Sequence, residues 1–290
     1  LSQLNIQGGQ HLVLLHPLHK SMLQRYQHYF AQGLTKLVNR RLTTKKDGAI
    51  VIALTEICTK NLHKISVRAA NSISINTLTN VVAMLPGTTK EDEVVLYSAH
   101  YDHLGIIKNK KTTDTIFNGA DDDASGTAAI INLAQYFAKQ GNNSRSLMFA
   151  AFSAEEIGSF GSQYFSKQLD VSTVTAMLNI EMIGKPSQFG AGTVWMTGME
   201  HSDLGKQLNT ALTGTGMKIY KDPFPEQGLF YRSDNATLAR LGVPAHSFSS
   251  AQLDKDQHYH QVSDDLASLN LPSLHKVIKA LAIATQPLVD

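Results

Sequence analysis

The chain has 290 residues, of which 42% are apolar and 17% charged, and its 26 lysines and arginines against 24 acidic residues give a formal net charge of +2. This composition is typical of a globular protein and argues against a disordered chain. It also argues against a nucleic-acid partner, because the sequence has no dense stripe of lysine and arginine. No apolar stretch reaches the roughly 20 residues needed to cross a bilayer, so we expect no membrane span.

A single cysteine, Cys58, rules out an internal disulfide and a structural zinc site built from thiolates. The chain begins with Leu1 rather than methionine, so its natural N-terminus is either missing or was processed. We expect a secreted or periplasmic protein. The residue types predict no particular oligomeric state.

Residues 1–75 carry the weakest pattern and are expected to form an N-terminal segment of one helix and short strands. Apolar residues at near-helical spacing predict an amphipathic helix over residues 21–42. A turn then leads into a predicted strand over residues 49–54, and alternating apolar residues predict another short strand over residues 65–69.

Strands alternate with helices through residues 76–290, which we expect to form the main domain. The predicted strands cover residues 81–85, 94–99, 147–152, 174–180, 194–197, 217–220 and 244–248. The predicted helices cover residues 124–140, 160–169, 204–212, 229–241 and 274–288. The first two strands are expected to pair as a hairpin. This alternation predicts the α/β class, as a three-layer α/β/α sandwich with a central mixed, mostly parallel sheet.

An acidic loop lies near the middle of the chain. Asp121, Asp122 and Asp123 are consecutive between Gly119 and Gly126. Three adjacent carboxylates repel one another, so a folded protein keeps them together only in water or around a cation. A solvated helix N-terminus is the simpler alternative. The cation is favoured where other ligand-type residues converge on the same loop.

Ligand-type residues follow three of the predicted strands. His100 and Asp102 follow the second strand, and because alternate residues of a strand share a face, Asp102 is expected beside His100. A carboxylate there can accept the second ring N–H of a metal-bound histidine and fix its tautomer. Glu155 and Glu156 follow the third strand, and Glu181 follows the fourth. Open α/β sheets place their sites at the carboxyl ends of strands, so we expect these side chains to meet.

A histidine near the C-terminus completes a metal-ligand set of two imidazoles and three carboxylates, a mixture that suits zinc or a similar divalent ion. The set is His100, Asp122, Glu156, Glu181 and His260. Two metal ions that share a bridging carboxylate would use all five ligands. Three other histidines are interpreted as structural, namely His103, His201 and His246.

With these motifs in order, the chain resembles the M28 family of zinc aminopeptidases and carboxypeptidases. The resemblance covers about residue 80 to the C-terminus, and several motifs in one order are far more specific than any one of them. The matching stretches are Asn80 to Gly87, His100 to Gly105, Gly119 to Gly126, Ala154 to Ser159, Asn179 to Gly184, Arg232 to Asp234, and His260 with Asp264. The resemblance implies a zinc exopeptidase fold with its catalytic domain at residues 76–290. It suggests that residues 1–75 are the remnant of an insert or prodomain.

The resemblance implies two zinc ions bridged by Asp122. One ion would also bind Glu156 and His260, and the other would bind His100 and Glu181. Relatives usually carry aspartate where this chain has Glu181, so the second zinc site depends on a longer side chain.

The resemblance assigns Glu155 as the general base and Asp102 as the carboxylate that orients a histidine ligand. Neighbours in an extended segment point opposite ways, so Glu156 can face a metal ion while Glu155 faces the bound water. Tyr231 is a candidate donor to the tetrahedral oxyanion and equally a candidate core residue on a helix face. The resemblance also implies that the peptide bond after Asp122 is cis.

The favoured interpretation is a metal-dependent exopeptidase, specifically an aminopeptidase that hydrolyses N-terminal residues from peptide substrates. A carboxypeptidase of the same family is one alternative. A second is a glutaminyl cyclase-like acyltransferase, but such cyclases carry a Thr-Asp-Ser type of sequence where this chain keeps Asp121, Asp122 and Asp123. A third is a non-catalytic binding domain of receptor type, which would have lost ligands that this chain retains.

Overall fold

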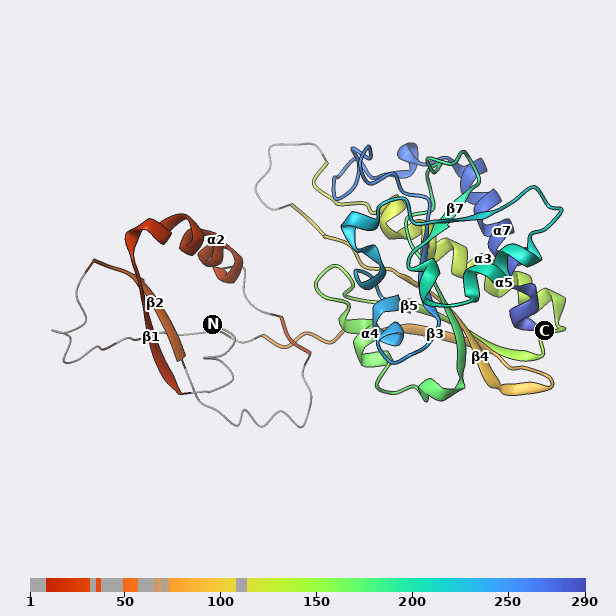
Figure 1. Ribbon diagram of the computed structural model, residues 1–290, viewed down its shortest axis with the longest axis horizontal. Helices are drawn as coiled ribbons and strands as arrows, with labels where there is room; N and C mark the ends of the chain where they lie inside the picture. Colours follow the sequence, from red (N-terminus) through yellow and green to blue (C-terminus); the bar gives the residue numbers. More distant parts are fainter. Residues whose placement is uncertain are drawn as a thin grey trace. The chain divides into compact units, whose positions relative to one another are not determined.

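The structure is a computed structural model that describes residues 9–31, 35–37, 49–56, 66, 68, 72, 74–107 and 114–290. The chain divides into two compact units, Leu1–Asn76 and Thr77–Asp290, which Figure 1 colours from red to orange and from orange to blue. Cys58 and the apolar residues that predicted a strand over residues 65–69 lie outside the described part. Among the described residues, no helix combines the length and apolar character that a membrane span requires.

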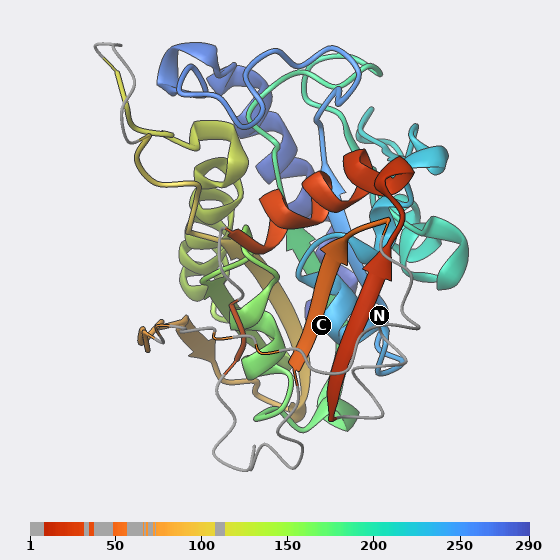
Figure 2. The same cartoon turned by 90° about the vertical axis from the view of Figure 1, so that its left-hand side faces the viewer.

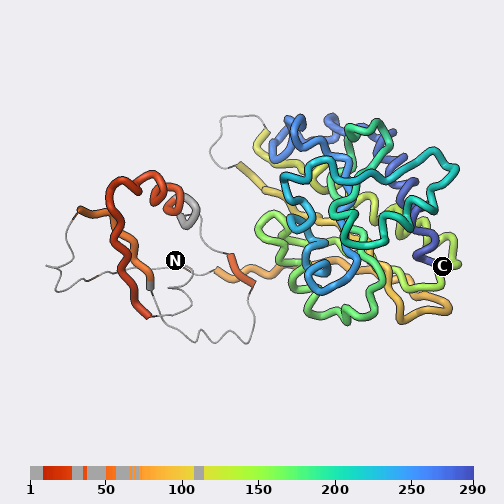
Figure 3. Tube along the Cα trace, in the orientation of Figure 1, coloured from red at the N-terminus to blue at the C-terminus, as the bar shows by residue number. Residues whose placement is uncertain are grey.

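The first unit contains a small parallel sheet and one helix. β1 (Gln10–Leu15) pairs in parallel with β2 (Ala49–Leu54), and α2 (Lys20–Ala31) lies between them in the chain. Figure 2 shows the two strands side by side, and Figure 3 traces the chain from β1 into α2. The predicted strand is confirmed, whereas the predicted helix over residues 21–42 is too long, because residues 35–37 are not helical.

The second unit is organised around a seven-stranded sheet in the order β3-β5-β4-β6-β9-β7-β8. Its strands are β3 (Val81–Leu85), β4 (Lys90–His100), β5 (Arg145–Phe152), β6 (Val174–Ile180), β7 (Val194–Met196), β8 (Ile219–Lys221) and β9 (Ala245–Ser249). Parallel pairing joins β5, β4, β6 and β9 in turn and joins β7 to β8, while β3 and β7 run antiparallel to their neighbours β5 and β9. The sheet is therefore mixed and mostly parallel, as predicted.

Helices cover both faces of this sheet (Figure 1). One face packs against α3 (Gly126–Gln140), α5 (Leu204–Ala211) and α7 (Leu271–Val289), which supply fully buried side chains such as Leu133, Leu208 and Leu281. The other face packs against the region of α4 (Phe160–Phe165) and α6 (Asn235–Ala239). Each large apolar side chain removed from water contributes about 1.5–3 kcal/mol. The three-layer α/β/α prediction is confirmed.

The predicted hairpin between residues 81–85 and 94–99 is wrong. β3 pairs with β5 instead, with Val81 opposite Ala151 and Leu85 opposite Leu147. Both edges of β4 are occupied by the parallel strands β5 and β6, so no edge remains for β3. After β3 the chain crosses to the start of β5, where the Gly87 amide donates to Ser146 Oγ at 3.0 Å.

Candidate metal centre

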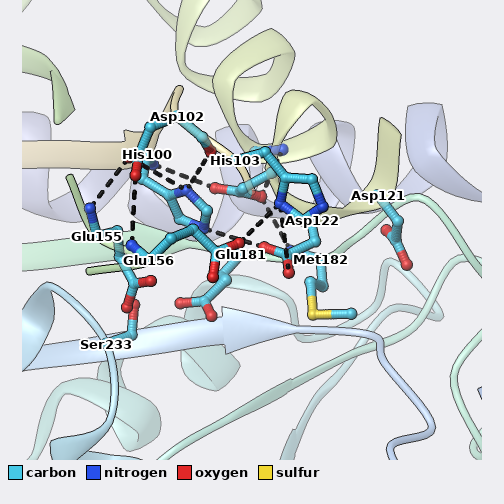
Figure 4. Close-up of polar contacts among 12 residues, drawn as sticks. His100, Asp102, His103, Asp121, Asp122, Glu155, Glu156, Glu181, Met182 and Ser233 are labelled. Atoms are coloured by element: carbon cyan, nitrogen blue, oxygen red, sulfur yellow. Dashed lines mark hydrogen bonds and ion pairs between the residues drawn. The ribbon is translucent and has the colours of Figure 1, made fainter. Parts of the chain in front are cut away.

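The carboxyl ends of three adjacent parallel strands bring four of the predicted site residues together (Figure 4). β4 ends at His100, β5 is followed by Glu155 and Glu156, and β6 is followed by Glu181. Because β5, β4 and β6 are direct neighbours in the sheet, their ends meet at one edge. The apolar runs that form the strands thus determine where the polar residues after them lie.

The backbone bends sharply beside these glutamates. Ala154, just before Glu155, has φ +60°, and Met182, just after Glu181, has φ +52°. His260 has φ +57°. This left-handed region is uncommon for residues with side chains, and its concentration at one place is typical of functional sites.

Asp122 lies between two imidazoles. Its Oδ1 is 3.1 Å from His100 Nε2, and its Oδ2 is 3.3 Å from His260 Nε2. The side chain is 4% exposed, and the peptide bond that follows it is cis, as the resemblance implied. One carboxylate thus presents each of its oxygens to a different histidine.

Glu156 extends the same cluster. Its Oε2 lies 3.3 Å from His260 Nε2, the same separation as that between His260 and Asp122 Oδ2. Ligand atoms at about 2.0 Å from a tetrahedral zinc ion are about 3.3 Å apart. The distance from His260 to each of the two carboxylates therefore fits one shared zinc ion.

His100 gives an independent indication of a missing partner. It is 1% exposed, and within the described part of the chain its Nε2 makes no aligned hydrogen bond although Asp122 Oδ1 is 3.1 Å away. A buried polar atom without a partner is costly, and two facing ligand atoms without hydrogen-bond alignment suit a shared cation. The donor set at this position fits a metal ion.

Glu181 follows β6 at the same edge of the sheet, but its carboxylate lies farther from the histidines than that of Asp122 or Glu156. Its Oε2 accepts a hydrogen bond of 3.3 Å from Asn179 Nδ2, and among the described residues no histidine lies within 4.0 Å of its carboxylate. Asn179 is itself held by Ser98, Ser233 and Ser247 at 2.7, 2.9 and 3.1 Å. A buried amide and hydroxyl network therefore supports the longer side chain at this position.

The electrostatics of the cluster favour positive charge. Burial alone would lower the pKa of His100, but Asp122 and the charges of Asp123, Glu181 and Glu155 raise it well above its ordinary value. Burial opposes ionisation of Asp122, yet the adjacent imidazoles of His100 and His260 outweigh it and lower the pKa of this carboxyl. A site that draws protons onto a buried imidazole is also one that attracts a metal cation.

Burial also opposes ionisation of two glutamates in the cluster. It raises the pKa of Glu155, and the nearby charge of Glu181 raises it further. Burial likewise raises the pKa of Glu181. Four carboxylates in one cavity repel one another, so at least one positive charge is needed to hold them ionised together.

The other two acids of the loop do not face the histidine cluster. Asp121 accepts from the Gly184 amide at 2.7 Å and lies 3.4 Å from Lys185 Nζ, and burial raises its pKa to about 6. Asp123 accepts backbone N–H groups from His100, Gly126 and Met182 at 3.0 to 3.2 Å. Only the middle carboxylate is thus free for a cation, while its neighbours fix the loop. The solvated-terminus alternative is wrong, because all three acids are buried.

Asp102 lies beside His100, but its carboxylate is not the acceptor. His100 Nδ1 lies 3.1 Å from the Asp102 main-chain oxygen and 3.7 Å from its Oδ1. The carboxylate instead accepts the backbone N–H groups of Glu155 and Glu156 at 3.0 and 3.3 Å. Asp102 therefore orients the histidine through its carbonyl and the two glutamates through its side chain.

His103, interpreted from the sequence as structural, lies within the cluster. Its Nδ1 is 2.7 Å from Glu156 Oε1 and 4.0 Å from Asp122 Oδ2. His103, Asp122 and Glu156 form a candidate metal-ligand group among the described residues. The sequence signal was present, because His103 follows His100 and Asp102 in one motif.

Tyr231 lies away from the candidate site. It is 51% exposed, its ring carries the Arg240 guanidinium at 5.1 Å, and it is not among the described residues that line the cavity. The predicted helix over residues 229–241 is interrupted, because the structure has a short 3₁₀ turn, Leu229–Tyr231, followed by the separate helix α6. Tyr259 lines the cavity instead and stacks on His260 with ring centroids 3.9 Å apart.

A cavity of about 190 Å³ opens beside the cluster. Asp122, Glu155, Glu156 and Glu181 line its acidic side. Apart from His260, the rest of the lining is half apolar or aromatic and half polar: the first group is Met182, Trp195, Leu229, Ala251, Leu253 and Tyr259, and the second is Thr197, Gln227, Arg232, Ser233, Ser247 and Ser249. Such a cavity can hold an apolar side chain next to a polar reaction centre.

Comparisons with known sequences match most of the second unit. The family model described as Peptidase family M28 matches residues 80–285. Leucine aminopeptidase 1 of Emericella nidulans is 28% identical over 201 residues, which cover 66% of this chain and 50% of that protein. A probable zinc metalloprotease of Leptosphaeria maculans is 36% identical over 109 residues, 37% of this chain and 25% of that protein. The chain spans between a quarter and a half of the length of these relatives.

Solved structures share the fold. BSAP, a zinc aminopeptidase from Bacillus subtilis, matches with a TM-score of 0.59 and 19% identity over 73% of this chain and 50% of that one. Porphyromonas gingivalis glutaminyl cyclase matches with a TM-score of 0.55 and 18% identity over 72% of this chain and 77% of that one. At these identities the likeness concerns the fold alone.

Proposed function

The chain belongs to peptidase family M28, and from that premise we propose that it is a zinc-dependent exopeptidase that removes N-terminal residues from peptides. One observation carries the proposal: the carboxylate of Asp122 has His100 Nε2 at 3.1 Å from one oxygen and His260 Nε2 at 3.3 Å from the other. A carboxylate with an imidazole at each oxygen supports a bridging role between two cations.

Two zinc ions are proposed. The first would be held by Asp122, Glu156 and His260, and the distance of 3.3 Å from His260 Nε2 to each carboxylate supports tetrahedral coordination. The second would be held by Asp122, His100 and Glu181. The Asn179 hydrogen bond to Glu181 supports this role, because metal-binding carboxylates are usually oriented by a further hydrogen bond.

Glu155 is the proposed general base. Bound zinc would lower the pKa of a water molecule and polarise the scissile carbonyl. Glu155 lines the cavity beside these ligands, and its backbone is fixed by the 3.0 Å hydrogen bond from its N–H to Asp102. Its carboxylate would accept the proton of the attacking water and return it to the leaving amine. The Asp102 carboxylate would fix the positions of Glu155 and of the ligand Glu156, because it accepts hydrogen bonds from their adjacent backbone N–H groups.

The proposed substrate is a peptide with an apolar N-terminal residue. Met182, Trp195 and Leu229 are among the apolar residues that line the cavity together with the acids. The name of one sequence relative, a leucine aminopeptidase, supports an aminopeptidase rather than a carboxypeptidase. Glutaminyl cyclase remains the second candidate, because one cyclase shares the fold.

The test is hydrolysis by the purified chain after loading with zinc. We expect release of amino acids from unblocked peptides, loss of activity on chelation, and recovery when zinc is restored. Peptides acetylated at the N-terminus should resist, whereas peptides amidated at the C-terminus should be cleaved. Hydrolysis that survives complete removal of metal contradicts the proposal, and pyroglutamate formation without hydrolysis would favour the cyclase.

A further inference from the structure

The second histidine of the His100 to His103 motif has no part in the chemistry proposed above, yet it contacts a candidate ligand. His103 Nδ1 lies 2.7 Å from Glu156 Oε1, and the two side chains are 9% and 6% exposed. An ionised carboxylate can only accept a hydrogen bond, so the His103 ring N–H is the donor. The other carboxylate oxygen, Oε2, is the one that lies 3.3 Å from His260.

The surrounding backbone leaves space for this imidazole. Gly119 has φ +61°, and a Cβ at that position would lie 2.8 Å from His103 Cγ. The ring also meets Phe117 and His260 edge to face, with centroid distances of 6.2 and 5.8 Å. A residue with a side chain at position 119 would therefore displace the ring from Glu156.

The distances distinguish a hydrogen-bond donor from a metal ligand. Two ligands of one tetrahedral zinc ion are about 3.3 Å apart. His103 Nδ1 is closer than this to Glu156, at 2.7 Å, and farther from Asp122, at 4.0 Å. His260 Nε2 lies 3.3 Å from both carboxylates. His260 has the spacing of a ligand, and His103 has that of a partner of a ligand.

We propose that His103 is a positioning residue that holds Glu156 Oε1 by a hydrogen bond and so leaves Oε2 as the single oxygen of Glu156 for zinc. A carboxylate fixed in this way binds through one oxygen and keeps a coordination position open for water and substrate. This inference rests on the proposed zinc site. It concerns the affinity and coordination of zinc, which can be measured without turnover.

The first experiment measures zinc affinity by competition with a chromophoric chelator. Leucine and asparagine have nearly the same shape, but only asparagine carries an amide N–H near the place of Nδ1. We expect His103→Leu to lower zinc affinity about 10–100-fold, as loss of a hydrogen-bond partner to a ligand commonly does, and His103→Asn to restore most of it. His201, which is 51% exposed, supplies matched controls: His201→Leu and His201→Asn should bind zinc as the wild type does.

The second experiment uses the wild-type chain, so it does not depend on whether a variant folds. The protein is loaded with an NMR-active cadmium isotope, and scalar coupling from the metal to histidine rings is recorded. We expect coupling to His260 and none to His103, whose signals are identified by their absence in His103→Asn. Coupling to His103 overturns the proposal, because it makes this residue a ligand.

Equal zinc affinity in wild type, His103→Leu and His103→Asn also overturns the inference while leaving the proposed function intact. Failure of the wild-type chain to bind zinc at all would instead remove the proposed function. The two failures are therefore distinguishable in the same set of measurements.

Discussion

Lys185 and Asp256 form an ion pair with 2.8 Å between Nζ and Oδ2. The same ammonium lies 3.4 Å from Asp121 and 3.6 Å from Asp264, and the three acidic side chains are at most 4% exposed. Asp121 precedes the bridging candidate, and Asp256 and Asp264 flank the segment that carries His260. One lysine thus connects two loops that bring candidate ligands to the site.

Replacing this lysine should strongly destabilise the fold. Lys185→Met leaves three buried carboxylates without their cation, and we expect the free energy of unfolding to fall by about 3 kcal/mol or more. The measurement is urea unfolding of the metal-free protein. Lys221→Met is the control, because Lys221 is 61% exposed in its pair with Glu200 and such surface pairs contribute less than about 1 kcal/mol. Equal losses in the two variants would contradict the expectation.

Glu155→Gln should separate catalysis from metal binding. The amide cannot accept the proton of the attacking water, so we expect kcat to fall by about 10²–10⁴-fold. Zinc affinity should stay that of the wild type, because this residue is not a proposed ligand. Steady-state kinetics and chelator competition on one preparation check both parts, with Glu200→Gln as the control at a 54% exposed glutamate. A variant that loses zinc instead would reassign Glu155 as a ligand.

The number of zinc ions can be read from single substitutions. We expect two ions per wild-type chain and one in either Glu181→Ala or His260→Ala, because each variant loses a ligand of only one proposed site. Elemental analysis after dialysis against dilute zinc measures the ratio, and His201→Ala should still hold two. Two ions in Glu181→Ala would show that this glutamate is not needed for the second site.

Two tyrosines provide a matched pair of substitutions. Tyr259 lines the cavity, whereas Tyr231 is half exposed outside it. If the Tyr259 hydroxyl donates to the oxyanion, Tyr259→Phe should lower kcat by about 10²–10³-fold, as loss of such a donor commonly does. Tyr231→Phe should leave kcat unchanged. The opposite order would restore the role that the sequence suggested for Tyr231.

The sequence predicts those site residues that lie at the ends of strands better than those that lie in loops. His100 ends a buried strand, Glu181 comes directly after another, and Glu155 and Glu156 follow a third within four residues, and the hydrophobic runs that form such strands can be recognised in the sequence. His260 lies in a loop with positive φ, so its place was implied by family motifs rather than by periodicity.

The remaining features depend on loop conformation, which apolar spacing does not encode. Tyr231 was placed in a predicted helix over residues 229–241, either as an oxyanion donor or as a core residue, but in the structure it ends a short 3₁₀ turn. Tyr259 and Lys185 have roles that appear only once the loops pack against the acidic segment. The predicted partner of β3 was wrong for a related reason. An apolar run predicts a strand, but it does not identify the strand with which it pairs.

Acid should weaken the fold through His246, which lies outside the candidate metal centre. The ring is buried; its Nδ1–H donates to the Thr197 carbonyl at 2.8 Å, and its Nε2 accepts from Ser202 Oγ at 2.7 Å. Burial lowers the pKa of His246, although the Thr197 hydrogen bond opposes this shift. The neutral ring therefore satisfies both nitrogens, and the folded state binds a proton less readily than the unfolded state.

The direction of the pH effect follows from this difference. The unfolded chain takes up a proton near the ordinary histidine pKa of about 6.5, so the stabilisation is present above that pH and is lost as the pH falls toward the lower folded pKa. Chemical unfolding of metal-free protein across this window should show the decrease, and His246→Gln should reduce it. Metal must be absent, because zinc ligands release protons on binding. An equal slope in wild type and His246→Gln would contradict the assignment to this ring.

The left-handed backbone at Ala154 and Met182 has a consequence for evolution in the laboratory. Glycine would relieve a conformational cost of about 1 kcal/mol at either position. Selection for heat tolerance alone should therefore enrich glycine there, and the hinge it introduces would loosen Glu155 or Glu181 beside it. Variants selected for heat tolerance alone should then have a low rate in the proposed hydrolysis. Selection for a higher rate should restore alanine and methionine at these positions.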